Sequence, residues 1–304
     1  MLHWFKNHIA TPSPNMPTAR RKCDLAIVFA VADGEWLGIE DLLDSCKTYL
    51  ACDYEIVVAD DVTTDGTYKR LLNSGSWVVR NPERQYLWGL DLTLRRAFQE
   101  AHRLFESPIY LKIDPDALII GPDLVAALGN AFSTNPEQGL LGSYHINCNG
   151  EQRDLSYWRE RMFRVSKDLG KPYQLAVQNG YQVGDGVQGG AYALSRACLD
   201  KIAKCGWLSG ADGYHPSGVR GRYVAEDSLI TMLTFAAGYK VGDFGGPGQP
   251  FGLRHIGLPM SPEDLVRHNH IVTHAMKYHD ENSLAARDFF RARRLAYRLE
   301  QGYS

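Results

Sequence analysis

Two short apolar segments that each end in aspartates constrain the fold of this chain more than any other feature. Residues 54–61 end in two adjacent aspartates, and residues 109–116 end in an Asp-Pro-Asp triplet. Continuous runs of branched apolar residues are typical of strands that are buried on both faces of a parallel sheet. Ligands bind such sheets at the edge formed by the carboxyl ends of the strands. The two segments therefore predict a carboxylate-lined ligand site at one edge of a sheet.

Strand-like and helix-like segments alternate from residue 24 to residue 113. Strands are predicted at residues 24–34, 55–59, 77–79 and 109–113, with helices at 37–50, 66–74 and 87–105 between them. This alternation is the pattern of a parallel α/β sheet. Beyond residue 121 the pattern loosens into glycine-rich loops, and two further helices are predicted near 195–205 and 227–237.

The composition limits which ligands and frameworks the chain can have. Hydrophobic residues make up 44% of the 304 positions, which is enough for a sizeable core. Lysine and arginine total 33 against 35 aspartates and glutamates, so no overall positive charge favours nucleic acid as a partner. The six cysteines include no C-x-x-C pair, which argues against a zinc or disulfide framework and favours reduced thiols.

The Asp-Pro-Asp triplet is the strongest candidate for a metal site. Asp114 and Asp116 can both bind one hard divalent cation, Mn²⁺ or Mg²⁺, which would neutralise a diphosphate. An isolated triplet of this kind is more often a polar turn, because aspartate and proline are common turn residues. The strand that precedes it and the companion strand at residues 55–61 favour the metal site.

Five segments, in order, resemble the motifs of family 2-like glycosyltransferases with the GT-A fold. They are residues 55–67 (the nucleotide-binding signature), 79–90 (the element that follows it), 114–116 (the DxD motif), 189–191 (the glycine loop) and 226–227 (the acidic pair). Their order and spacing agree over residues 24–243. The resemblance implies an α/β fold of the GT-A type, in which a Rossmann-like nucleotide-binding half with a mostly parallel sheet is fused to an acceptor-binding half.

We also expect a particular division of the chain from this resemblance. Residues 23–280 would form one GT-A catalytic domain, with a nucleotide-sugar-binding half at 23–120 and an acceptor-binding and catalytic half at 121–280. Residues 1–22 would be an N-terminal extension, and residues 281–304 a C-terminal helix.

The C-terminal helix carries an arginine-rich stretch at residues 288–298, which we expect to form a solvated basic face. A second interpretation brings this stretch, with the aromatic and basic residues at positions 4–6, into contact with a membrane that carries a lipid-linked acceptor. The apolar run at 25–32 is too short to span a bilayer, and the polar residues 11–22 resemble a linker rather than a signal peptide. We therefore expect a cytoplasmic protein, either free or peripheral at the inner face of a membrane.

The resemblance implies a nucleotide sugar as the donor, a UDP-hexose, with a divalent cation on its diphosphate. Asp61 would hydrogen-bond the base, and Ala30 and Asp33 would line the nucleoside pocket. Asp114 would lie near the ribose or the metal, and Asp116 would be the closer metal ligand. With the glycine loop, the implied donor-binding residues are Ala30, Asp33, Asp61, Asp114, Gly189 and Gly190.

Many GT-A enzymes add a histidine from the C-terminal part of the chain to the metal shell. Two candidates compete here, His255 and His274. A lone histidine is more often a structural or surface residue than a metal ligand. His274 is the stronger candidate, because Lys277 follows it closely and could meet a phosphate charge of the donor.

Glu226 and Asp227 stand at the start of a predicted helix. Acidic residues in that position can simply cap the helix and favour its dipole. An inverting sugar transfer also needs a base that takes the proton of the acceptor hydroxyl, and a carboxylate in a cleft can serve. We predict that Asp227 is this base and that Glu226 places the acceptor or the donor sugar. Trp207, in the glycine-rich segment 206–221, is predicted to stack on the acceptor sugar from a mobile lid.

The predicted function is a metal-dependent, inverting transfer of a hexose from a UDP-sugar to a saccharide or lipid-linked acceptor. Retaining transferases and nucleotidyltransferases share the fold and stay as alternatives. A nucleotidyltransferase usually has a glycine-rich loop with lysine or arginine after its first strand, which residues 32–35 lack. A non-enzymatic nucleotide-sugar or carbohydrate-binding protein is a further alternative, although the acidic site residues are all present. No G-x-G-x-x-G follows the first strand, which argues against a dinucleotide-dependent oxidoreductase.

Overall fold

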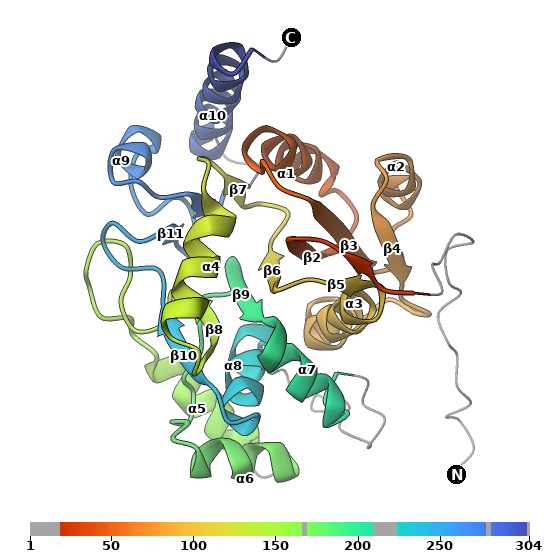
Figure 1. Ribbon diagram of the computed structural model, residues 1–304, viewed down its shortest axis with the longest axis vertical. Coiled ribbons are helices and arrows are strands. Elements are labelled where there is room, and N and C mark those ends of the chain that lie inside the picture. The colour runs from red at the N-terminus through yellow and green to blue at the C-terminus, as the bar shows by residue number, and fades with distance from the viewer. Residues whose placement is uncertain (1–18, 166–168, 209–223, 278–280, 303–304) are drawn as a thin grey trace.

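A seven-stranded mixed sheet forms the centre of the protein (Figure 1). The computed structural model describes residues 19–165, 169–208, 224–277 and 281–302. The strands lie in the order β4-β3-β2-β6-β9-β8-β10. They are β2 (Leu25–Val31), β3 (Tyr54–Asp60), β4 (Trp77–Arg80), β6 (Ile109–Ile113), β8 (Gln138–Gly142), β9 (Ala191–Ser195) and β10 (Lys240–Asp243).

The direction of the strands brings the predicted motifs to one edge of this sheet. Strand β9 is antiparallel to β6 and β8, whereas the other neighbouring pairs of the seven are parallel. Strands β2, β3, β4 and β6 therefore end at the edge where β9 begins. Ala191 at the start of β9 lies opposite Ile113 at the end of β6. The amide of Asp114 consequently donates a 2.9 Å hydrogen bond to the carbonyl of Gly190.

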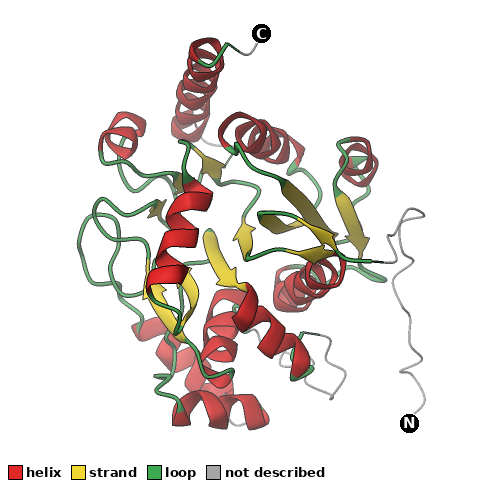
Figure 2. Ribbon diagram, in the orientation of Figure 1, coloured by secondary structure: helices red, strands yellow, loops and turns green. Residues whose placement is uncertain are grey.

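Helices surround the sheet, as Figure 2 shows in red against the yellow strands. The helices are α1 (Trp36–Tyr49), α2 (Thr67–Asn73), α3 (Leu90–Leu104), α4 (Leu124–Thr134), α5 (Ser156–Val165), α6 (Gly170–Gln178), α7 (Arg196–Lys204), α8 (Glu226–Ala236), α9 (Pro262–Arg267) and α10 (Glu281–Glu300), with a short 3₁₀ turn at Leu87–Gly89. Successive residues of β2 belong to different apolar cores, because side chains alternate between the faces of a strand. Ala26 and Val28 pack with residues of α3 and α8, whereas Ile27 and Phe29 pack with residues of α1 and α4.

A small three-stranded sheet places the C-terminal part of the chain beside the Asp-Pro-Asp triplet. Its strands lie in the order β11 (Phe251–Leu253), β12 (Val272–His274) and β7 (Leu118–Ile119). Thr273 of β12 pairs with Leu118 of β7. Because β7 begins two residues after Asp116, this register brings the end of β12 to the triplet. A further pair of strands, β1 (Arg21–Lys22) and β5 (Phe105–Glu106), lies outside the central sheet.

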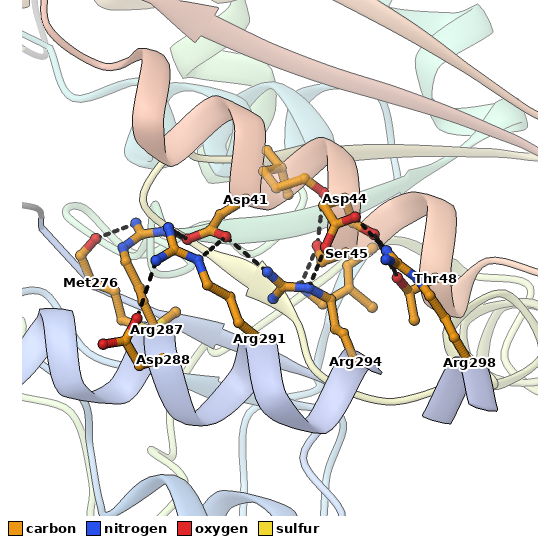
Figure 3. A network of polar contacts seen from close by, with 12 residues as sticks. Asp41, Asp44, Ser45, Thr48, Met276, Arg287, Asp288, Arg291, Arg294 and Arg298 are labelled. Atoms are coloured by element: carbon orange, nitrogen blue, oxygen red, sulfur yellow. Dashed lines mark hydrogen bonds and ion pairs between the residues drawn. The ribbon is translucent and has the colours of Figure 1, made fainter. Parts of the chain in front are cut away.

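The solvated basic face expected for the C-terminal helix is only partly correct, because Arg291 and Arg293 are exposed whereas Arg294 is buried. Arg287, Arg291, Arg294 and Arg298 of helix α10 point toward α1, as Figure 3 shows. The side chains of Arg287 and Arg294 are 0% and 2% exposed, and both form ion pairs with Asp41 of α1. Arg298 forms an ion pair with Asp44, one turn further along α1. The local pattern could not show this, because the partner carboxylates lie in the first helix of the chain.

In the part of the chain that the structure describes, no helix combines the length and the apolar character that a membrane crossing requires. The predictions made for residues 1–18, including the aromatic and basic positions 4–6, lie outside the described residues. The same holds for residues 209–221 of the predicted lid.

Candidate active site

Asp114, Asp116 and His274 form a cluster that could hold a metal ion. The Nε2 atom of His274 lies 3.1 Å from Asp116 Oδ1 and 3.7 Å from Asp114 Oδ2. One ligand atom of each side chain lies within 4.8 Å of the other two. Two carboxylate oxygens and one imidazole nitrogen are a donor set that suits a divalent cation. The residues present therefore fit the metal that the sequence implies.

The imidazole of His274 is held in the orientation that a metal ligand needs. Its Nδ1 atom lies 2.7 Å from the carbonyl oxygen of Arg254, which favours a proton on Nδ1 and turns Nε2 toward the carboxylates. A Cβ atom at Gly190 would lie 2.4 Å from His274 Cγ, so only glycine leaves room for this ring. The competing candidate, His255, is exposed and does not belong to the cluster among the described residues.

The charges in this cluster favour a cation between its three side chains. Burial alone would raise the pKa of Asp116, but its hydrogen bond to His274 and the charge of that ring outweigh burial and lower the pKa. Burial alone would lower the pKa of His274, and the same contact with Asp116 raises it instead. The carboxylates thus stabilise positive charge at this point, either as a proton on the imidazole or as a bound cation.

Lys112 is a site residue that the sequence analysis missed. Its side chain is fully buried, and its Nζ atom lies 2.6 Å from Asp114 Oδ1 and 3.2 Å from Glu226 Oε1. The ammonium also donates to the carbonyl of Gly189 and lies 5.4 Å from the ring centroid of Tyr192. Burial lowers the pKa of Lys112, but the two carboxylates outweigh burial and raise it, so the residue is charged. The signal was a lone lysine inside the apolar strand β6, since a buried lysine needs anionic partners.

The acidic pair lies in the first turn of α8, beside the glycine loop. Ala225 is the N-cap residue, so neither carboxylate caps the helix from that position. A Cβ atom at Gly189 would lie 3.0 Å from Glu226 Oε1 and 3.2 Å from Asp227 Oδ2. Burial and the charge of Glu226 raise the pKa of Asp227 to about 7, against a hydrogen bond from Ser228. A carboxyl group with this pKa can serve as a general base near neutral pH.

Asp61 and Asp33 organise the loops at the ends of β2, β3 and β4. The buried carboxylate of Asp61 accepts hydrogen bonds from the side chain of Asn81 at 2.9 Å and from the amides of Gln85 at 2.7 Å and Tyr86 at 2.8 Å. Asp61 therefore shapes the loop that follows β4.

The carboxylate of Asp33 accepts a 2.6 Å hydrogen bond from the amide of Thr64 and forms an ion pair with Arg84. These two contacts lower the pKa of Asp33 to about 2. Ala30 is half-buried in β2 and packs against the core, three residues before Asp33. The three residues predicted to contact the nucleoside thus lie on strands or loops at the same edge of the sheet, namely Ala30, Asp33 and Asp61.

The sequence matches no family model and no curated protein. Among solved structures, the chain is similar to the apo structure of the bifunctional glycosyltransferase WbbM, with a TM-score of 0.50 and 12% identity. The chain has a GT-A glycosyltransferase fold. The alignment covers 90% of this chain and 50% of the WbbM chain, so the GT-A fold described here spans half the length of that structure.

Two other similar structures have lower TM-scores. The mannosyltransferase PcManGT from Pyrobaculum calidifontis, in complex with GDP-Man and Mn²⁺, gives a TM-score of 0.47 at 17% identity, over 97% of this chain and 68% of that one. A TarS structure from S. aureus gives 0.45 at 15% identity, over 91% and 72%.

Glu35 is a second residue beside the candidate metal cluster that the sequence analysis missed. It precedes α1, and its carboxylate accepts a 2.7 Å hydrogen bond from the amide of Ala32. Burial raises the pKa of Glu35 to about 7, and the charges of Asp114 and Asp116 act in the same direction. The exposed Lys277 lowers the pKa of Glu35 and of Asp116, which places its ammonium near this acidic cluster.

Trp207 lies away from the surface of the GT-A fold. Its side chain is 7% exposed and belongs to the core that contains α3 and α8. Its carbonyl accepts a 3.1 Å hydrogen bond from Arg95. The acceptor-stacking role of Trp207 stays a prediction, since the segment after it lies outside the described residues.

The structure therefore brings seven of the predicted site residues together around Lys112, namely Asp114, Asp116, Gly189, Gly190, Glu226, Asp227 and His274.

Proposed function

We propose that the protein is a metal-dependent, inverting glycosyltransferase that transfers a hexose from a UDP-hexose to a saccharide or lipid-linked acceptor. The observation that carries this proposal is the chain of contacts from Asp114 through Lys112 to Glu226, next to Asp227. It joins a cluster that could hold a metal ion to a carboxyl group whose pKa is about 7. A titratable group with a strongly shifted pKa beside a possible metal site is a common feature of catalytic centres.

The donor would bind at the edge of the sheet where β2, β3 and β6 end. Asp114, Asp116 and His274 would hold Mn²⁺ or Mg²⁺, and the cation, when bound, supplies positive charge that neutralises the diphosphate. Lys277, which is exposed beside this cluster, would meet a phosphate oxygen. The nucleoside would lie along Ala30 and Asp33, with Asp61 at the base, where three internal hydrogen bonds already fix its carboxylate.

Asp227 would act on the acceptor. Its carboxylate would take the proton of the acceptor hydroxyl while the hydroxyl oxygen attacks the anomeric carbon of the hexose. The bond between that carbon and the diphosphate oxygen breaks in the same step, and its electron pair leaves with UDP. Glu226, held by the ammonium of Lys112, would orient the sugar hydroxyls during this displacement.

Donor binding provides the first test of this function. We expect a UDP-hexose with Mn²⁺ to raise the melting temperature of the purified protein, because a ligand that binds only the native state stabilises it. A panel of nucleotide sugars, each with and without Mn²⁺, identifies the base and the sugar. No shift with any donor would contradict the proposal.

Transfer itself is tested with Asp116→Asn. This variant should keep the fold and lose metal-dependent turnover, because one carboxylate of the cation cluster is removed. Wild-type turnover and metal dependence in the variant would overturn the assignment of the metal site. The anomeric configuration of the first product, measured by NMR, distinguishes inversion from retention. Donor binding without transfer to any acceptor would favour the binding-protein alternative.

A further inference from the structure

Arg287 connects helix α10 with helix α1 and with the segment that follows β12 (Figure 3). Its side chain is fully buried. Its Nη1 atom donates a 2.9 Å hydrogen bond to Asp41 Oδ2 on α1, and its Nη2 atom donates to the carbonyl of Met276. A guanidinium is planar and holds two acceptors in a fixed relative position. Arg287 therefore fixes the backbone at Met276 relative to helix α1.

Met276 is in turn hydrogen-bonded to the Asp-Pro-Asp triplet, residues 114–116, which we call the predicted metal loop. It follows His274 by two residues, and its amide donates a 2.8 Å hydrogen bond to the carbonyl of Asp116. The two backbone groups of Met276 thus bind Arg287 on one side and the metal loop on the other. The segment that carries His274 is held by both contacts.

The packing around Arg287 leaves little room for movement. A Cβ atom at Gly38 of α1 would lie 2.6 Å from the carbonyl oxygen of Pro115 and 3.6 Å from Arg287 Nη2. Helix α1, the middle residue of the triplet and the guanidinium therefore meet at one point. A shift of Arg287 would disturb the backbone at Met276, whose carbonyl accepts its hydrogen bond.

We propose that Arg287 is a positioning residue of the metal site, which acts through Met276 to hold His274 against Asp114 and Asp116. The inference rests on the proposed metal-dependent function and assigns part of that function to the C-terminal helix. Metal ligands need their geometry held to within about 0.5 Å. Residues that orient metal ligands without touching the metal typically change its affinity by about 10–100-fold when they are removed.

Arg294 offers a matched control on the same helix. It too is buried, with a side chain that is 2% exposed, and it also forms an ion pair with Asp41. Its second partner is Asp44 of α1, at 2.7 Å, rather than the backbone after β12. Loss of either arginine leaves the Asp41 carboxylate with one partner fewer in a buried position, so both should lower stability. Only the loss of Arg287 should lower the affinity of the site for Mn²⁺.

The experiment compares Arg287→Met, Arg287→Lys and Arg294→Met with the wild type in the full-length protein. Mn²⁺ affinity is measured by titration calorimetry without donor, and the melting temperature is measured without metal. We expect both methionine variants to melt earlier. We expect Arg287→Met to bind Mn²⁺ about 10–100-fold more weakly, and Arg294→Met to stay within about twofold of the wild type. The Mn²⁺ affinity of Arg287→Lys should lie between those of the two methionine variants, since an ammonium keeps the charge but not the planar pair of donors.

The outcomes separate this inference from the proposed function. Equal Mn²⁺ affinities of the two methionine variants would overturn the positioning role and leave the metal site intact. A wild-type protein that binds neither Mn²⁺ nor Mg²⁺ would overturn both. If Arg287→Met does not fold, Arg287→Lys decides, and wild-type Mn²⁺ affinity in that variant counts against the inference.

Discussion

The ammonium of Lys112 lies 3.2 Å from the carboxylate of Glu226, across 114 residues of sequence. The contact joins the end of strand β6 to the first turn of helix α8. Because Asp114 binds the same ammonium at 2.6 Å, one buried cation connects the metal cluster with the acidic pair. The predicted donor-binding and acceptor-binding groups are thus held together by a buried lysine that contacts both of them.

Replacement of Lys112 by methionine should therefore impair both stability and catalysis. Loss of one partner from a buried ion pair leaves the others uncompensated, which costs about 3–5 kcal/mol of unfolding free energy. We expect kcat to fall by about 100-fold, as misplaced catalytic groups commonly cause. Urea unfolding and steady-state kinetics measure the two effects. The exposed Lys277, changed to methionine, serves as the control: it should keep wild-type stability and raise only the KM for the donor.

The pH dependence of transfer should report the ionisation of Asp227. Burial and the charge of Glu226 raise the pKa of Asp227 to about 7, and the base must be ionised to accept a proton. The rate should rise about tenfold per pH unit below pH 7 and level off above it. Asp227→Asn should lower kcat by about 10²–10⁴-fold at pH 8, should remove the dependence of the rate on this ionisation, and should still bind the donor. A flat rate profile from pH 5 to pH 8 would be inconsistent with this role.

The same ionisation should appear in stability. Between the ordinary aspartate pKa and about 7, the folded protein holds a proton on Asp227 that the unfolded chain has released. The contribution of Asp227 to the free energy of unfolding therefore decreases as pH rises from the ordinary aspartate pKa to about 7. It stays at this lower value above pH 7. Asp227→Asn should accordingly melt at a higher temperature than the wild type at pH 8, and the difference should shrink at pH 4. The reverse order at pH 8 would mean that Asp227 is ionised without penalty.

A methyl group at Gly190 should disturb the metal cluster. The Cβ atom would lie 2.4 Å from His274 Cγ, so the imidazole has to move away from the carboxylates. We expect Gly190→Ala to weaken Mn²⁺ binding by about 10–100-fold, as other changes in ligand support do. Calorimetric titration measures the affinity. Gly121→Ala is a suitable control, because no atom lies within 4 Å of its added Cβ. Similar affinities in the two variants would show that the ring has room to shift.

Strands β2, β3, β4 and β6 and the two aspartates of the triplet could be predicted from sequence because their signals are local. An apolar run such as residues 109–113 shows a buried strand by itself, and its position fixes where Asp114 and Asp116 emerge. The roles of Lys112 and Glu35 could not be predicted in this way, because each depends on carboxylates that the fold brings from other segments.

The burial of the arginines of α10 could not be predicted from sequence either. Their spacing in the sequence is typical of an exposed basic helix, and no local feature distinguishes a solvated arginine from a buried one. Arg287 and Arg294 are buried because Asp41 lies on the facing helix, about 250 residues earlier. The sequence pattern therefore predicted the helix but not which of its arginines are buried against α1.

Asp61 leads to the last prediction, because its carboxylate already accepts three hydrogen bonds from the loop that follows β4. Asparagine at this position would keep one acceptor oxygen, and its NH₂ group would face the N–H of either Gln85 or Tyr86, whose acceptor is then lost. A buried donor left without its acceptor costs about 1–3 kcal/mol, so Asp61→Asn should be less stable. The displaced loop should also raise the dissociation constant for UDP, measured by calorimetry, with little change in Mn²⁺ affinity. Unchanged UDP binding in a destabilised Asp61→Asn protein would assign Asp61 to the loop alone and remove it from the nucleotide site.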